Sequence, residues 1–160
     1  MFNRRLSPDT VRAIHSAVEE ARLRDDPRIG TEHLLLGLLH DAGAGPAEIL
    51  GVKLPAARDA LHALDVQALR AVGVDPEGFG PLAVVRHKRH RSFTSRARGA
   101  LERTAVGAAR TKTRRAEPVH LLAALLAGTR PDPALDVLDQ LGVDPDAVRS
   151  RLATGEAGAA

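Results

Sequence analysis

The sequence predicts an all-α protein built from two four-helix repeats that pack with pseudo-twofold symmetry. Two observations indicate this fold class. Hydrophobic residues make up 44% of the 160 residues but aromatic residues only 2%, and an aliphatic core suits close-packed helices better than a sandwich of strands. In addition, a leucine-rich segment at residues 30–39 returns at residues 117–126, which indicates repeated structural units.

The internal repeat has a constant offset of 87 residues over its best-matched part. His33 of the first copy matches His120 of the second, and four leucines match around each histidine. Further along, the tripeptide Leu-Gly-Val at residues 50–52 returns at residues 141–143, after four extra residues in the second copy. Low complexity alone does not keep a histidine and a Leu-Gly-Val in order, so we interpret the chain as two related halves.

The first half contains signals for four helices. Ser7 is a capping residue, Pro8 suits the first helical position, and Asp9 complements the positive helix end. Apolar residues then recur at helical spacing until Asp26-Pro27 ends this helix. The other three helices are predicted from a Thr31 cap to Leu39, from Pro46 to Leu50, and from Pro55 onward with Leu61 and Leu64 on the apolar face.

The second half repeats this plan, and the two halves form one domain. Thr94 is predicted to cap a helix that ends near Thr111. Pro118 opens the next helix, and the last two are predicted at Ala134 to Leu141 and from Asp144-Pro145 to about Leu152. The predicted domain covers residues 1–153, with repeat one at 1–74, a linker at 75–91, repeat two at 92–153 and a frayed tail at 154–160.

The linker is set apart by composition. Residues 75–81 contain two Gly and two Pro, which disrupt helices, and a short extended piece is predicted at Leu82 to Val85. Each half is expected to cover the apolar face of the other, so neither half is expected to be stable alone. The linker ends in a basic cluster of Arg86, Lys88, Arg89 and Arg91.

The basic cluster raises an alternative function, which is nucleic-acid binding. The net charge is only +3, and the cluster lacks interleaved aromatic residues that stack on bases. Any such binding is expected to be weak, non-specific and salt-dependent. A solvated linker is the favoured interpretation of the cluster.

Several classes of protein are excluded by what the sequence lacks. It has no cysteine, no signal peptide and no apolar stretch near the roughly 20 residues of a membrane span, so we expect a cytoplasmic protein with no membrane association. Motifs for zinc proteases, serine hydrolases, dinucleotides and ATP are all missing. We therefore expect no catalytic residue, cofactor or metal; His33 and His120 are interpreted as buried residues that donate to the backbone, in preference to a metal pair.

Three sequence segments resemble the Clp N-terminal repeat domain, in particular that of ClpC-type unfoldases. They are Phe2, the run from Gly30 to Leu39, and the run from Phe93 to Arg98, and the resemblance covers about residues 1–153. It implies a non-catalytic, monomeric module that binds proteins or peptides, including arginine-phosphorylated proteins, cyclic peptides, and a Clp ATPase or its adaptors. Because no ATP-binding loop is present, we expect a stand-alone relative that acts as an adaptor or a decoy.

The resemblance also implies a ligand site. Glu32 would pair with the guanidinium of phosphoarginine, and Ser7, Thr31 and Thr94 would help helix N-termini to hold the phosphate. Glu32 has an alternative role as a first-turn residue that complements the helix dipole, and Ser7 and Thr94 have one as N-caps. Phe2 and Phe93 would line a groove, or pack at the repeat interface, and Arg98 would add affinity for phosphate.

The second repeat departs from this pattern. Val119 occupies the position that matches Glu32, and a valine accepts no hydrogen bond from a guanidinium. Glu117 lies two residues earlier, about 200° around a helix if that turn is helical. The sequence therefore supports only one of the two sites that the resemblance implies.

Overall fold

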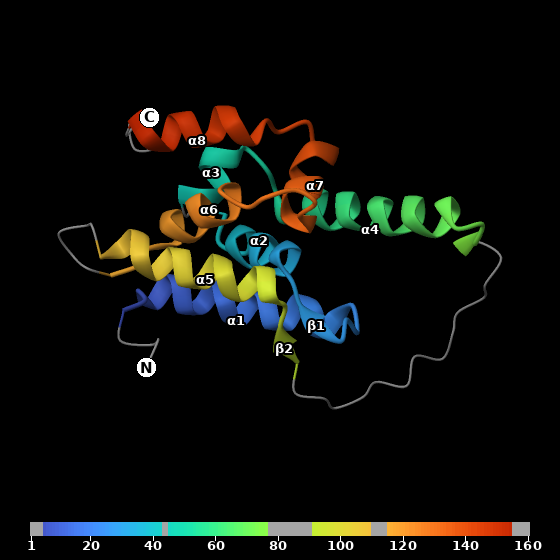
Figure 1. Ribbon diagram of the computed structural model, residues 1–160, viewed down its shortest axis with the longest axis horizontal. Coiled ribbons are helices and arrows are strands. Elements are labelled where there is room, and N and C mark those ends of the chain that lie inside the picture. Colours follow the sequence, from blue (N-terminus) through green and yellow to red (C-terminus); the bar gives the residue numbers. More distant parts are fainter. Residues whose placement is uncertain (1–4, 43–44, 77–90, 110–114, 155–160) are drawn as a thin grey trace.

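The computed structural model describes residues 5–42, 45–76, 91–109 and 115–154, and it confirms the all-α fold class (Figure 1). Each repeat contributes four helices to the described part of the chain, and one short strand in each repeat pairs with the other. Repeat one contains α1 (Pro8–Leu23), β1 (Arg28–Ile29), α2 (Thr31–Leu39), α3 (Gly45–Leu50) and α4 (Leu54–Ala71). Repeat two contains β2 (Ser92–Phe93), α5 (Ser95–Ala108), α6 (Pro118–Leu126), α7 (Pro133–Gln140) and α8 (Pro145–Thr154).

The starts of α1 and α5 confirm two predicted caps. Ser7 and Thr94 have extended backbones, and each side-chain oxygen accepts a hydrogen bond of 3.2 Å from the amide three residues on. The third predicted cap was wrong, because Gly30 is the N-cap of α2 and Thr31 is its first helical residue. The Gly30 amide is satisfied instead by a hydrogen bond to Nδ1 of His33.

Two short parallel pairings relate the repeats by a pseudo-twofold axis. Ile29 pairs with Phe93 in the β1–β2 sheet, and Leu6 pairs with Ala116 at the equivalent place. The Thr94 amide donates to the Ile29 carbonyl at 2.9 Å, and its equivalent, the Ser7 amide, donates to the Ala116 carbonyl at 3.0 Å. The sequence did not predict these strands, since two residues carry no alternating pattern.

Helix α2 lies at the centre of the molecule, between the two repeats (Figure 1). It packs on α1 of its own repeat and on α5, α6 and α7 of the other. Eight of its nine residues are buried, so it shows no polar face. In its counterpart α6, five of nine residues are buried. The leucines shared by these two helices are buried in both, and they are Leu34, Leu35, Leu38 and Leu39 in α2 and Leu121, Leu122, Leu125 and Leu126 in α6.

A buried carboxylate joins three helices of repeat one. The Glu20 side chain in α1 is 2% exposed and accepts hydrogen bonds from Arg58 of α4 at 2.5 and 3.1 Å. His40, at the C-terminal end of α2, lies 2.6 Å from the same carboxylate. Burial raises the pKa of Glu20, but the hydrogen bonds and charges of Arg58 and His40 lower it by more. The net pKa therefore lies below the ordinary value of 4.5.

This carboxylate is expected to make stability depend on pH in the acid range. A carboxyl group with a lowered folded-state pKa stabilises the fold above its unfolded pKa, and this contribution is lost as pH falls through the folded value. Glu20→Gln is therefore expected to lower the free energy of unfolding by about 1–3 kcal/mol near neutral pH. The difference from wild type should shrink with acidification in urea titrations followed by far-UV circular dichroism; a constant difference would contradict this account.

Several predicted features fall outside the described residues. They are the extended piece at Leu82–Val85, most of the linker, the tail after Thr154, and the predicted end of the first helix of repeat two near Thr111. Within the described ranges, none of the helices combines the length and apolarity that a bilayer span needs.

Candidate ligand-binding site

The Glu32 carboxylate folds back over the N-terminus of α2. Its Oε1 lies 3.2 Å from Nδ1 of His33, while Oε2 is shielded from solvent and has no hydrogen-bond partner. A β-carbon on Gly30 would lie 2.2 Å from both carboxylate oxygens. Gly30 therefore leaves the space that this carboxylate occupies.

His33 supports the turn beneath Glu32. The ring is buried, the Gly30 amide donates to Nδ1 at 2.9 Å, and Nε2 lies 2.9 Å from a carboxylate oxygen of Asp26. Burial raises the pKa of Asp26, but hydrogen bonds from His33 and Arg24 lower it more, so the carboxylate stays ionised. The predicted direction of the histidine–backbone bond was wrong: the ring accepts from the backbone. His120 repeats the bond by accepting from the Glu117 amide, but it is only partly buried.

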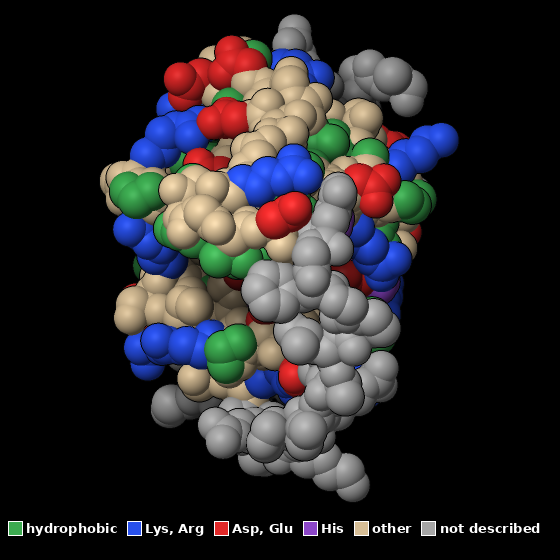
Figure 2. Space-filling view, turned by 90° about the vertical axis from the view of Figure 1, so that its right-hand side faces the viewer, with side chains coloured by type: hydrophobic (Ala, Val, Ile, Leu, Met, Phe, Trp, Pro, Cys, Tyr) green, Lys and Arg blue, Asp and Glu red, His purple; other side chains and the backbone are tan. Residues whose placement is uncertain are grey.

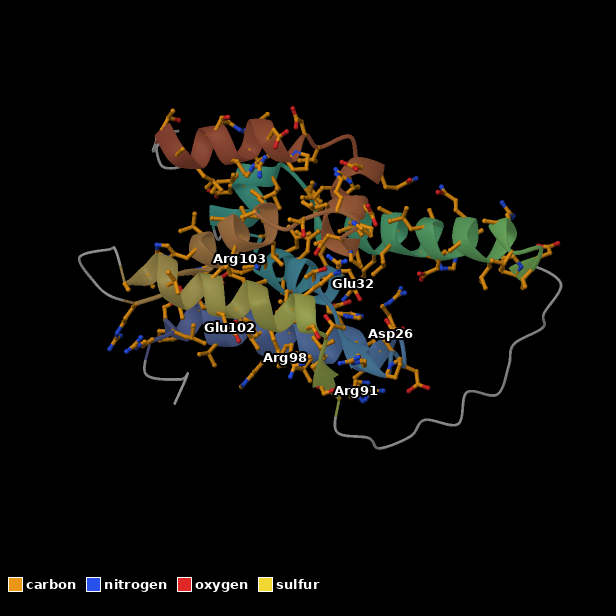
Figure 3. All side chains as sticks on the ribbon, in the orientation of Figure 1. Asp26, Glu32, Arg91, Arg98, Glu102 and Arg103 are labelled. Atoms are coloured by element: carbon orange, nitrogen blue, oxygen red, sulfur yellow. The ribbon has the colours of Figure 1, made fainter. Side chains whose placement is uncertain are left out.

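A pocket of about 350 Å³ opens beside Glu32, where α2 meets the N-terminal ends of α5 and α7. Figure 3 shows Glu32 close to the start of α5. The first amides of a helix have no partner within it, and the helix dipole makes this end positive. The pocket therefore combines a carboxylate from repeat one with a helix N-terminus from repeat two. Its lining residues are Gly30, Thr31, Glu32, Thr94, Ser95, Arg96 and Pro133.

Arg96 adds positive charge to this pocket. Its Nη1 donates to the Thr129 carbonyl at 3.1 Å, and the side chain is exposed. A guanidinium has five N–H donors, so this one bond leaves donors for an anion. The pocket is suited to a ligand that carries a cationic and an anionic group close together.

A separate apolar groove of about 420 Å³ lies between α1 and α5, on the pseudo-twofold axis. Its two walls are related by the repeat: Leu6 corresponds to Phe93, and Ile14 to Leu101. The symmetry is broken further along, where α5 places Arg98 and Glu102 opposite Val11 and His15 of α1. Arg98 and Glu102 are labelled on α5 in Figure 3. One wall of the groove is therefore more highly charged than the other.

The predicted ligand residues lie partly in the pocket, partly in the groove and partly in neither. Glu32, Thr31 and Thr94 line the pocket, whereas Phe93 and Arg98 line the groove. The Thr31 hydroxyl is 3.0 Å from the Asp132 carboxylate, a bond that joins the two repeats. Ser7 is buried at 3% exposure and its hydroxyl lies 3.0 Å from that of Thr10, while Phe2 lies outside the described residues.

Sequence reasoning missed the roles of Gly30, Ser95 and Pro133 in the pocket. The contrast between Gly30 and Glu117 at matching repeat positions was a signal for the first of these. Ser95 and Pro133 come into the pocket only through the packing of the two repeats. Within the described residues, no cluster of three or more His, Asp or Glu side chains is arranged to hold a metal ion.

One residue of the basic cluster, Arg91, has a structural role. Arg91 donates through Nε to the Asp26 carbonyl at 2.7 Å and through Nη2 to Asp25 at 2.9 Å, and its side chain is 10% exposed. Arg86, Lys88 and Arg89 lie outside the described residues. On the part of the face in Figure 2 that grey atoms leave visible, basic and acidic side chains are intermixed and form no continuous basic surface.

Comparisons with known proteins agree with the fold and the repeat. The family model for the Clp repeat N-terminal domain matches residues 5–74 and 92–157. The crystal structure of the N-terminal domain of the caseinolytic protease-associated chaperone ClpD from Arabidopsis thaliana is similar, with a TM-score of 0.68 and 22% identity over 97% of this chain and 96% of that one. A structure from a malarial protein secretion system has a TM-score of 0.61 and 16% identity, covering 94% of each chain. A comparison with curated proteins gave no match.

Proposed function

The chain belongs to the family of Clp repeat N-terminal domains, and we propose on this basis that it is a non-catalytic receptor for peptides that carry phosphoarginine. The family relation supports a protein-interaction module related to Clp unfoldases. The finer part of the proposal, the chemistry of the ligand, rests on the Glu32 pocket.

One observation carries the choice of ligand: Glu32, whose buried Oε2 has no hydrogen-bond partner, lines a pocket whose other side is a helix N-terminus. A buried acceptor without a hydrogen bond is unfavourable, so a donor that reaches Glu32 Oε2 gains more than it would at a solvated carboxylate. A guanidinium supplies such donors in a planar fork. The phosphoryl group on the same ligand then lies toward the positive end of α5 and Arg96.

The apolar groove fits the rest of a peptide ligand. Phe93, Leu101 and Ile14 offer an aliphatic and aromatic surface, and Arg98 and Glu102 offer charged groups on one wall only. Apolar side chains next to the phosphorylated arginine would bury surface here, which adds affinity without regard to the phosphate. Cyclic peptides are proposed as ligands of the same groove, and a Clp ATPase or its adaptors as protein partners.

The direct test is a titration with an arginine-phosphorylated peptide, using wild type and Glu32→Gln. Loss of a charge-assisted hydrogen bond to the ligand is worth about 1.5–3 kcal/mol, so the variant should bind roughly 10- to 100-fold more weakly. Isothermal titration calorimetry measures this directly. Equal affinity of the two proteins would remove Glu32 from the site.

A matched control separates ligand contact from helix electrostatics. Glu48 is also a first-turn glutamate, in α3, and it is exposed and does not line the pocket. Glu48→Gln changes the same charge at a helix start and is expected to leave affinity unchanged. The unphosphorylated peptide serves as the second control, because it keeps the guanidinium but lacks the anionic group that the α5 terminus and Arg96 would favour.

A further inference from the structure

The pseudo-twofold axis relates the residues of the Glu32 pocket to an equivalent place in repeat two. Glu117 there corresponds to Gly30, and Val119 to Glu32. The backbones correspond as well: Gly30 has φ −96° and ψ −177°, and Glu117 has φ −83° and ψ 162°. Each amide donates 2.9 Å to Nδ1 of the histidine three residues on. Glu117 is an extended N-cap residue, so the helical turn on which its expected position depended is not present.

This correspondence places the Glu117 side chain in the space that a second ligand carboxylate would need. In repeat one, a β-carbon at residue 30 would overlap the Glu32 carboxylate at 2.2 Å. The β-carbon of Glu117 occupies that equivalent place in repeat two. A glutamate at position 119 therefore has no room to fold back as Glu32 does, so the valine at this position is only part of the difference between the repeats.

The helix start that would bind a phosphoryl group also differs between the two repeats. The helix that faces it is α1, and its first two residues are Pro8 and Asp9, where α5 has Ser95 and Arg96. Proline has no amide to donate. Asp9 brings a negative charge that is paired with Arg12 at 2.7 Å, in place of the positive charge of Arg96. Both changes disfavour a phosphoryl group at this helix end.

We propose that the equivalent place in repeat two is closed to phosphoarginine by Glu117, Pro8 and Asp9, so that one chain binds one such ligand, at Glu32. This inference rests on the proposed function of the Glu32 pocket. It assigns the discrimination between the repeats to position 117 and the start of α1, in addition to position 119.

Calorimetry with an arginine-phosphorylated peptide gives the stoichiometry. We expect one site in wild type, a single site again in Val119→Glu, and at least a fivefold loss of affinity in Gly30→Ala, where a β-carbon displaces an intact Glu32 carboxylate. Two sites in wild type or in Val119→Glu would overturn the proposal, as would full affinity in Gly30→Ala. Glu117→Gln is the control for charge alone and should match wild type.

A second measurement decides the inference even if the peptide does not bind, a result that would count against the proposed function. Inorganic phosphate is titrated into isotopically labelled protein, and amide chemical shifts are followed by NMR. We expect the Ser95 and Arg96 amides to shift and those of Asp9 and Thr10 to remain in place. Shifts of equal size at both helix starts would show that repeat two is open to phosphate, and the proposal would be wrong.

Discussion

Gly37→Ala is expected to lower the free energy of unfolding by about 2–3 kcal/mol. A β-carbon at residue 37 would lie 2.2 Å from the carbonyl oxygen of Ala13 and 2.9 Å from the amide nitrogen of Ala17. Both are backbone atoms of α1, so neither moves aside without separating α1 from α2. Alanine favours helix over glycine by about 1 kcal/mol, and the contact with α1 is expected to outweigh this gain.

Gly107→Ala is the matched control for this substitution. Gly107 lies in the last turn of α5, and a β-carbon there meets no atom of the described residues within 4 Å. The same change of residue should therefore stabilise the protein, by at most about 0.5–1 kcal/mol, the gain for a helix interior. Urea unfolding followed by far-UV circular dichroism suits a chain that has no Trp or Tyr. Similar effects of the two substitutions would contradict the close approach of α1 and α2.

The sequence could predict the parts of the fold that depend on local signals. The caps at Ser7 and Thr94 and the proline at the start of α6 act within one turn, so their positions were predicted correctly. The Thr31 cap was wrong because the histidine at residue 33 satisfies the Gly30 amide, a less familiar capping arrangement. The repeat itself predicted a double four-helix unit.

Long-range features could not be predicted in this way. Glu20 follows another glutamate in the chain, and only its approach to Arg58 and His40 shows which of the two is buried. Glu32 was found as a candidate through the resemblance of its motif, but the helix start that faces it comes from the other repeat. A sequence pattern identifies single residues of such a pocket, but it does not show how the two repeats pack to bring those residues together.

Residues 1–76 and 91–160, produced as separate fragments, are each expected to remain largely unfolded and to fold when mixed. Helix α2 packs on three helices of the other repeat, and α7 packs on both α2 and α4. Exposing three or four leucine-sized side chains in a lone repeat costs roughly 5–10 kcal/mol, which is comparable to the whole stability of a typical domain. The lone repeats also lose the paired strands and the bond between Thr31 and Asp132.

Far-UV circular dichroism of each fragment and of their equimolar mixture measures this dependence. We expect weak helical signal from each fragment, and a mixture whose signal and cooperative thermal transition approach those of the intact chain. The intact chain with a protease site introduced between residues 77 and 90, cleaved after folding, is the control for the loss of chain connection. A fragment that unfolds cooperatively on its own would show that one repeat supports its own core. The contacts of α2 with the other repeat would then contribute less to stability than the burial of α2 indicates.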